Sequence, residues 1–418
     1  MPETLSNMRE TPAFRPEHLF FSRTDSAGRI QSANSVFQNV SGYDWGEIIG
    51  APHKLVRNPA MPRAVFKLLW TRMSAGDPVG LYVVNRTKSG EAYTVFAVSM
   101  PFEDGYVSVR LKPMSEQVAV MKALYGALAV RERDEGLDPE DSVGLLLSEV
   151  AEMGAPSYEA FMADALEREL LARCATLNRP KPRVVLALSG IEEAVKTIAN
   201  AGRNLDALLA QTNQIPDNMR LQAMRLEGRD GPIGVISANY QTMTETFTQS
   251  LKDFLQAAEN AIAPVSEAKF LAATSELVGE LLLHLQNETG MRPEKKANDL
   301  SALERMVQLY EEKTVQAVKD VARRAEYFER VSKDMRRMVF GLEMTRTMCN
   351  IERSKSESDT DALDGVVERL QQAEAQLSRL MEDVEGAVHD IIDRAGGLLR
   401  SREARHKFRQ ARKASAAA

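Results

Sequence analysis

A seven-residue repeat of apolar residues constrains the second half of this chain more than any other feature of its sequence. Apolar residues recur at this spacing from Ile191 to Leu226 and again from Ile233 to Phe254, with further apolar residues between them. This spacing is the seam of a packed helix, because side chains three and four residues apart share one helix face. A third stretch, from Leu363 to Ile391, keeps the repeat over five heptads. We therefore expect long helices that pack against one another.

Turn-forming residues separate the first two stretches and predict a helical hairpin. Between Leu226 and Ile233 the chain carries two glycines, a proline and two acidic residues, which do not comfortably continue a helix. The simplest interpretation is an antiparallel hairpin over residues 183–290, with its tip at residues 211–237. Pro216 falls inside the first arm, removes one helix hydrogen bond and is expected to bend that arm.

The following residues predict a second hairpin, over residues 291–400. Pro264 is expected to interrupt the returning helix of the first hairpin, and residues 287–293 are expected to end it. Ser301 and Glu304 have the spacing of a capping box for the next helix. Two hairpins would make a four-helix bundle, and the sequence leaves open whether that bundle forms within one chain or between two.

Short alternating segments replace the helical repeat in the N-terminal quarter of the chain. Residues 19–23 and 30–32 predict one β-hairpin, residues 81–85 and 93–100 predict a second, and residues 105–111 predict a further strand. The expected fold class is α+β, with an antiparallel sheet and short helices followed by a long all-α region. The expected segments are a flexible arm at 1–17, a sheet-containing domain at 18–114, a helical connector at 115–182, the hairpins at 183–290 and 291–400, and a basic tail at 401–418.

The composition and motifs of the chain argue against an enzyme. Charged residues are 27% and aromatic residues 6% of the 418 residues, a balance typical of long solvated helices. The sequence has no P-loop, no kinase ATP-binding motif and no metal-spaced set of His and Cys. Its two cysteines lie in no motif and fit a reducing cytoplasm. Because it has no run of about 18 apolar residues, we expect a cytoplasmic chain without a transmembrane segment.

The order of strands and loops in the N-terminal quarter resembles a PAS sensor domain. The residues that carry the resemblance are AlaAsnSerValPhe at 33–37, SerGlyTyr at 41–43, GluIleIleGly at 47–50 and GlyTyrValSerValArg at 105–110. The resemblance implies that this domain senses a stimulus.

Within that class, residues 57–62 (RNPAMP) resemble the flavin-binding PAS domains of energy-taxis receptors. Arg57, Pro59, Met61 and Pro62 match the pattern of that family. The resemblance implies that FAD would be held by four residues, Asn34, Arg57, Trp70 and Asn85.

Three positions depart from the flavin-binding pattern. Asn58, Ala60 and Val79 stand where it has a histidine, an aspartate and a tryptophan. We therefore expect FAD to bind weakly or not at all, and the alternative is a cavity that is empty or filled by side chains. The nearby His53 is a candidate haem ligand, against its more ordinary role as a hydrogen-bonded side chain.

Residues 211–237 resemble the signalling tip of methyl-accepting chemotaxis receptors and align with that tip without a gap. The residues that keep or nearly keep the family's pattern are Gln211, Thr212, Asn213, Asn218, Leu221, Ala223, Arg225, Val235 and Ile236. The resemblance implies contact with a chemotaxis coupling protein and, through it, with a histidine kinase. It implies partner binding by five of these residues, namely Asn218, Leu221, Arg225, Val235 and Ile236.

The same resemblance implies a homodimer or a higher array, since receptors of that family pair two identical hairpins into a four-helix bundle. Ala210, Gln214 and Asp217 stand where the family packs neighbouring dimers through aliphatic or aromatic residues. The alternative function is a PAS-regulated coiled-coil scaffold whose tip does not contact the chemotaxis kinase. We expect no nucleic-acid partner in either case.

Overall fold

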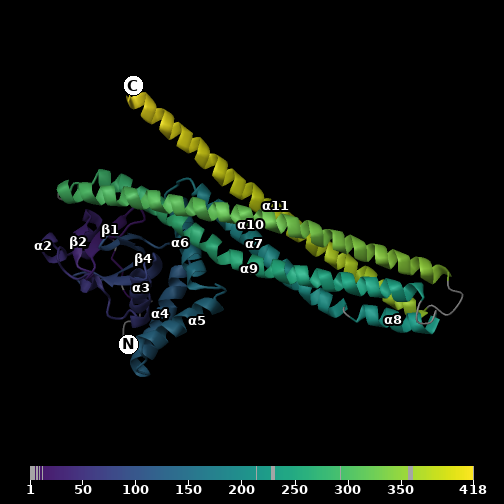
Figure 1. The fold of residues 1–418 in the computed structure, drawn as a ribbon. Coiled ribbons are helices and arrows are strands. Elements are labelled where there is room, and N and C mark those ends of the chain that lie inside the picture. Colours follow the sequence, from purple (N-terminus) through teal and green to yellow (C-terminus); the bar gives the residue numbers. More distant parts are fainter. Residues whose placement is uncertain are drawn as a thin grey trace. The chain divides into compact units, whose positions relative to one another are not determined.

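The computed structural model describes residues 5, 8, 10, 11, 13–212, 214–226, 231–291, 293–355 and 361–417. The fold is α+β, with one antiparallel sheet near the N-terminus and long helices after it, as the sequence predicted (Figure 1). Contacts divide the chain into two compact units. The first unit contains Met1–Leu186 and Ser266–Gln316, and the second contains Ala187–Val265 and Ala317–Ala418.

A five-stranded antiparallel sheet forms the centre of the first unit. Its strands lie in the spatial order β2-β1-β5-β4-β3. They are β1 (Leu19–Asp25), β2 (Ile30–Ala33), β3 (Val79–Arg86), β4 (Ala92–Phe102) and β5 (Gly105–Leu111). The two predicted hairpins and the predicted closing strand are confirmed. We call residues 19–111 the sheet domain.

Short helices connect β2 to β3 and cover one face of the sheet. They are α1 (Ser35–Ser41), α2 (Trp45–Ile48), the 3-10 helix η1 (His53–Val56) and α3 (Arg63–Ser74). The ring of Phe20 on β1 meets that of Phe37 on α1 edge to face, with centroids 6.0 Å apart. Tyr93 of β4 stacks on Phe20 at 5.6 Å. These aromatic side chains form the core on this face of the sheet.

Within the part of the chain that the structure describes, six long helical segments and two shorter ones follow the sheet. They are α4 (Gln117–Asp134), α5 (Pro139–Glu152), α6 (Tyr158–Thr176), α7 (Arg183–Thr212), α8 (Ile215–Leu226), α9 (Pro232–Gln286), α10 (Pro293–Lys355) and α11 (Asp361–Ala417). None of the helices within the described residues is both long and apolar enough to cross a membrane.

Helices from distant parts of the sequence cover the opposite face of the sheet. Tyr82 of β3 donates a hydrogen bond of 2.8 Å to Glu169 of α6. A Cβ atom placed on Gly80 would lie 2.9 Å from Cε2 of Phe270, so the first-unit part of α9 packs closely on the sheet. Both faces of the sheet are therefore buried, whereas antiparallel sheets commonly leave one face in solvent.

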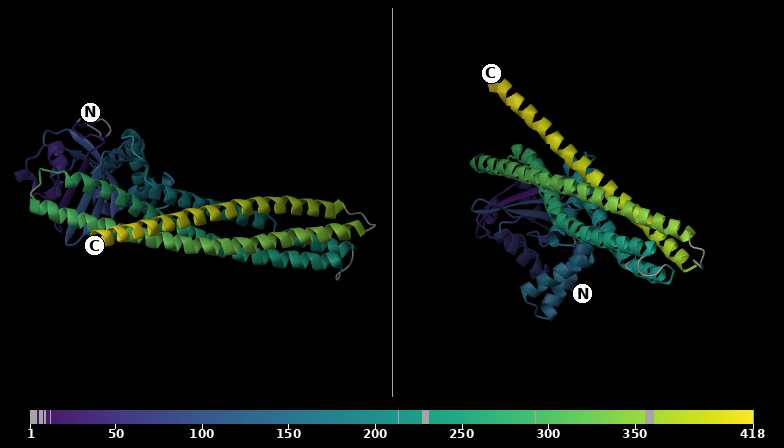
Figure 2. Two further views of the ribbon diagram at one scale, coloured as in Figure 1. Left: turned by 90° about the horizontal axis from the view of Figure 1, so that it is seen from above. Right: turned by 45° about the vertical axis from the view of Figure 1, so that its right-hand side comes forward.

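The second unit is a bundle of helices that run alongside one another (Figures 1 and 2). It consists of α7 and α8, the first part of α9, the last part of α10, and α11. The repeat positions are buried, as predicted, at Ile191, Ile198, Leu205, Met219, Ile233, Tyr240, Phe247, Phe254, Leu370, Leu377, Val384 and Ile391. In this structure one chain supplies both hairpins of the bundle.

Two predicted features of the long helices are wrong. α9 continues through Pro264, because the buried packing of Ala261, Val265 and Ala268 around it offsets the hydrogen bond that proline removes. α10 begins at Pro293, which suits a first helical position, so the expected capping box lies inside the helix. Pro216 lies at the second position of α8, and the predicted bend stays a prediction, because residue 213 between α7 and α8 lies outside the described residues.

Part of the segment expected to be a flexible arm packs onto the sheet domain. Phe14 is buried, and its ring meets that of Phe20 edge to face with centroids 4.8 Å apart. The backbone amide of Thr11 donates to the carbonyl of Ala92 at 2.8 Å. The packed core therefore begins before residue 18.

Candidate sensing and partner-binding sites

Asn34 ties α1 to β1 inside the sheet domain. Its Oδ1 accepts hydrogen bonds from the backbone amides of Phe21, at 3.0 Å, and Phe37, at 3.2 Å. Its Nδ2 donates to the carbonyl of Leu19 at 2.8 Å. Asn34 is thus the N-cap of α1 and satisfies backbone groups of two elements, which makes its role in this structure a structural one.

Arg57 and Asn85 are neighbours in the same domain, joined by an isolated antiparallel bridge between their backbones. The guanidinium carbon of Arg57 lies over the ring of Phe66, 3.6 Å from its centroid. Burial lowers the pKa of Arg57, and the nearby carboxylate of Glu132 opposes this shift. One face of the guanidinium is therefore covered by an aromatic side chain.

Trp70 lies on α3 at the surface of the domain and is 39% exposed. Its ring meets that of Tyr106 edge to face, with centroids 5.4 Å apart. A Cβ atom placed on Gly28 would lie 3.2 Å from Cη2 of Trp70, so the indole covers the turn between β1 and β2. Trp70 therefore contacts a different part of the domain from Asn34.

A buried cation next to a histidine was not predicted from the sequence. Arg110 of β5 is 5% exposed and donates to Oγ of Ser22, at 3.0 Å, and to Nε2 of His53, at 2.9 Å. Burial lowers the pKa of Arg110 to about 10. Burial and then the charge of Arg110 lower the pKa of His53 to about 3. His53 is therefore neutral near pH 7, and its Nε2 accepts a hydrogen bond instead of ligating haem iron.

The candidate partner-binding residues lie near one end of the second unit. Leu221 of α8 and Val235 of α9 are 54% and 59% exposed. Asn218 is half-buried and Ile236 is buried, so only Val235 of the adjacent pair is presented to solvent. The backbone of Arg225 belongs to α8, but its side chain lies outside the described part of the structure.

Both hairpins contribute to a groove at this end. The groove has a volume of about 440 Å³ and is lined by Pro232, Val235, Ile236, Asn239, Met348, Ile351 and Glu352. Met348 and Ile351 come from α10 and are 56% and 51% exposed. Exposed apolar residues gathered in one place are typical of protein-binding surfaces. Sequence reasoning missed the α10 residues, although Met344 and Ile351 repeat the spacing of Met219 and Leu226 ahead of a turn.

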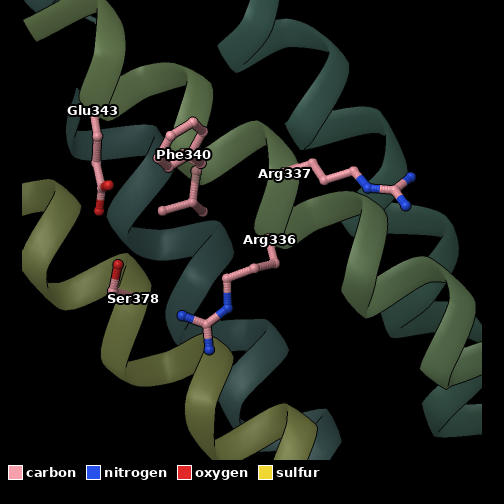
Figure 3. Close-up of a pocket in the computed structure, with 6 residues that line it drawn as sticks. Arg336, Arg337, Phe340, Glu343 and Ser378 are labelled. Atoms are coloured by element: carbon pink, nitrogen blue, oxygen red, sulfur yellow. The ribbon is translucent and has the colours of Figure 1, made fainter.

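A second hollow, of about 380 Å³, lies between α10 and α11 in the same unit (Figure 3). Arg336 reaches toward α11 and forms two hydrogen bonds with Glu385, of 3.0 and 2.9 Å. Arg337 points away from α11 and pairs with Asp334 at 2.9 Å. Both arginines are paired with carboxylates. Among the apolar residues that line this hollow, Phe340 is exposed and Val339 is buried.

No protein-family model matches the sequence. Over 112 residues, however, the chain is 39% identical to the aerotaxis receptor of Escherichia coli (strain K12), a match that covers 26% of this chain and 22% of the receptor. Over those 112 residues the chain is similar to the aerotaxis receptor. The chain spans less than a quarter of the length of that receptor. Residues 19–111 of this chain carry the resemblance to a PAS sensor domain, and from here on we call this sheet domain the PAS domain.

Solved structures of similar domains include two light-sensing proteins. The dark structure of the blue-light photoreceptor Aureochrome1 LOV is 23% identical over 25% of this chain and 81% of that chain, with a TM-score of 0.22. The LOV domain of the blue-light activated histidine kinase EL346 from Erythrobacter litoralis is 15% identical over 22% of this chain and 90% of that chain, with a TM-score of 0.20.

The residues expected to bind FAD do not fit a common flavin site in the PAS domain. The amide of Asn34 is bonded to backbone groups, the guanidinium of Arg57 lies over Phe66, and Trp70 lies at the surface. The side-chain amide of Asn58 lies 3.1 Å from the sulfur of Met8. At these positions Asn34, Arg57 and Asn58 make contacts within the chain. Weak or absent binding of FAD stays a prediction.

Proposed function

We propose that this chain is a PAS-based taxis transducer, without catalytic activity of its own, that relays the state of its PAS domain to a histidine kinase. One observation carries the proposal: α9 and α10 each belong to both compact units. Residues 266–286 and 293–316 pack in the unit of the PAS domain, and the rest of both helices forms part of the bundle. A change at the PAS domain thus acts on two helices that continue into the bundle.

The partner that we propose at the tip is a chemotaxis coupling protein, and the compartment is the cytoplasm. Asn218, Leu221, Arg225, Val235 and Ile236 are the proposed partner-binding residues. Leu221 and Val235 are exposed apolar side chains, the kind of anchor that usually dominates protein interfaces. Ile236 is buried and would act by supporting Val235. We propose no nucleic-acid partner.

A homodimer or higher array is also proposed, but the core of the bundle is an unsuitable place for that contact. The repeat positions of the bundle are buried by helices of the same chain. Association between chains would therefore use the outer surface, where the groove residues Val235, Met348 and Ile351 are exposed.

The test is a binding measurement between the full chain and a purified coupling protein. Val235→Asp should weaken binding at least about tenfold, because a charge would replace an apolar anchor. Leu283→Asp is a matched control on the same helix, since Leu283 is 61% exposed and lies in the other unit. Equal losses in the two variants, or none in either, would contradict the proposed surface.

The second candidate function is a PAS-regulated scaffold whose tip does not contact the kinase. Ala210, Gln214 and Asp217 favour it, because they replace apolar packing residues of the receptor pattern. Arg225→Glu separates the two functions, since it reverses a charge while keeping a good helix former. A transducer should lose affinity for the coupling protein at unchanged helicity, whereas a scaffold should show no binding even in the unaltered chain.

A further inference from the structure

The connection between α9 and α10 contacts one corner of the PAS domain, which consists of the start of α1 and the strands β1 and β2 before it. Glu288 lies in this connection, and its Oε2 accepts hydrogen bonds from the backbone amide and from Oγ of Ser35, at 3.2 and 2.7 Å. Its Oε1 accepts from the amide of Gly290 at 2.8 Å. Ser35 begins α1, and a carboxylate is favoured there because it meets unpaired amides at the positive end of a helix. Burial opposes ionisation, but these hydrogen bonds lower the pKa of Glu288 overall.

Two side chains of α10 hold the same corner. Nζ of Lys295 donates to the carbonyl of Gln31 on β2 at 2.6 Å. Oδ1 of Asp299, which is fully buried, lies 3.1 Å from Nε of Arg23 on β1. Because β2 is the edge strand of the sheet, this corner has no further strand to support it. One short segment, residues 288–299, therefore supplies three charged contacts to the start of α1 and to the two strands before it.

Asn34 connects this corner to the interior of the PAS domain. Its side chain bonds to Leu19 and Phe21 of β1 and to Phe37 of α1. Since Asn34 directly precedes Ser35, a rearrangement of the core that moves Asn34 also moves the two groups that bind Glu288. The carboxylate of Glu288 therefore contacts the residue that directly follows Asn34, although Glu288 lies 253 positions after Ser35 in the sequence.

Ion pairs between α9 and α6 in this unit would survive a change at Ser35. Arg173 of α6 is nearly buried and pairs with Glu280 of α9 through two hydrogen bonds. Lys269 of α9 pairs with Asp164 and with Glu167 of α6, the latter at 3.2 Å. These pairs fix the α9 segment to α6, so loss of the Ser35 contact would free the α9–α10 connection without detaching α9.

We propose that the contact between Ser35 and Glu288 is the point at which the PAS domain controls α9 and α10. In one state the contact holds the connection against α1, and in the other a shifted core withdraws Ser35 and frees the connection. This inference rests on the proposed function as a transducer. Glu288 has a positioning role in this inference, because Glu288 acts through α9 and α10 and binds no ligand.

Hydrogen exchange of backbone amides in the full-length chain tests the proposal. Glu288→Gln and Ser35→Ala should each speed exchange about tenfold or more in α1 and in residues 285–300, because the first removes the charge of the acceptor and the second removes the donor hydroxyl. Exchange should also change in the second-unit parts of α9 and α10, residues 232–265 and 317–355. Glu294→Gln, on an exposed side chain in the first turn of α10, is the control and should change neither region.

The double variant gives a second, independent readout. If the two side chains act through one contact, Ser35→Ala should add little to the effect of Glu288→Gln. Faster exchange confined to α1 and residues 285–300 would overturn the proposal, since the contact would then only fasten the connection. Exchange unchanged throughout would overturn it as well. Coupling-protein binding by the unaltered chain, measured separately, would reveal a failure of the proposed function without affecting the exchange result.

Discussion

The aromatic rings of Phe254 on α9 and Phe328 on α10 meet edge to face in the bundle, with centroids 5.3 Å apart. Phe254 belongs to the first hairpin and Phe328 to the second, and both side chains are buried. In the receptors that this tip resembles, the two hairpins come from two chains. Here one chain supplies both, so the association of the hairpins should not depend on protein concentration.

Truncating this contact should destabilise the bundle strongly. Phe328→Ala removes a buried ring and leaves a cavity, which should lower the free energy of unfolding by about 3 to 5 kcal/mol. Phe340→Ala on the same helix is the control and should cost well under about 1 kcal/mol, because Phe340 is 60% exposed. Denaturant unfolding followed by circular dichroism measures both. Equal losses of stability in the two variants would contradict the burial of Phe328 in the bundle.

Replacing Asn34 separates a structural role from a ligand-binding role. Asn34→Ala leaves the amides of Phe21 and Phe37 and the carbonyl of Leu19 without their partner, so the free energy of unfolding should fall by about 2 to 4 kcal/mol. The measurement is made on protein free of flavin. Trp70→Phe is the comparison and should cost much less, because Trp70 packs at the surface. If Asn34 served mainly to bind FAD, its loss would leave the flavin-free protein as stable as before.

Local patterns predicted the elements of this fold because each depends on residues close in sequence. The heptad positions Ile191 and Ile198 of α7 and Phe247 and Phe254 of α9 are buried, as their spacing predicted. The cover on the opposite face of the sheet was not predicted, because it joins Tyr82 to Glu169, 87 residues away, and Gly80 to Phe270, about 190 residues away, and has no local pattern. One signal was available: β4 is apolar almost throughout, as expected for a strand buried on both faces.

The candidate sites were less predictable than the fold. The heptad repeat places Ile233, Ile236 and Tyr240 on the core face, from which the exposure of Val235 follows. The burial of Arg110 could not be inferred, since an arginine in a strand is ordinarily a surface residue. Met348 and Ile351 belong to the groove only because α10 folds back beside α9.

Gly105 should be sensitive to any side chain. A Cβ atom at this position would lie 2.1 Å from the carbonyl oxygen of Thr24, a backbone atom of the paired strand β1 that cannot move aside cheaply. Gly105→Ala should therefore destabilise the PAS domain by about 1 to 3 kcal/mol or more. Gly126→Ala is the matched control in α4, where the added methyl meets nothing within 4 Å and a helix gains up to about 1 kcal/mol. Thermal unfolding should shift in opposite directions in the two variants.

The neutral His53 should make the chain sensitive to acid. The pKa of His53 is about 3 in the folded chain, against 6.5 for an unperturbed histidine, because burial and the charge of Arg110 disfavour its protonated form. Between these values the unfolded chain binds a proton that the folded chain does not, so the free energy of unfolding falls as the pH drops below about 6.5. His53→Gln keeps an acceptor for Arg110 and removes the titration. The stability difference between the unaltered chain and this variant should therefore shrink by about 1 to 2 kcal/mol from pH 7.5 to pH 5. Denaturant unfolding at the two pH values measures it, and an unchanged difference would mean that His53 has the same pKa in the folded chain as in the unfolded chain.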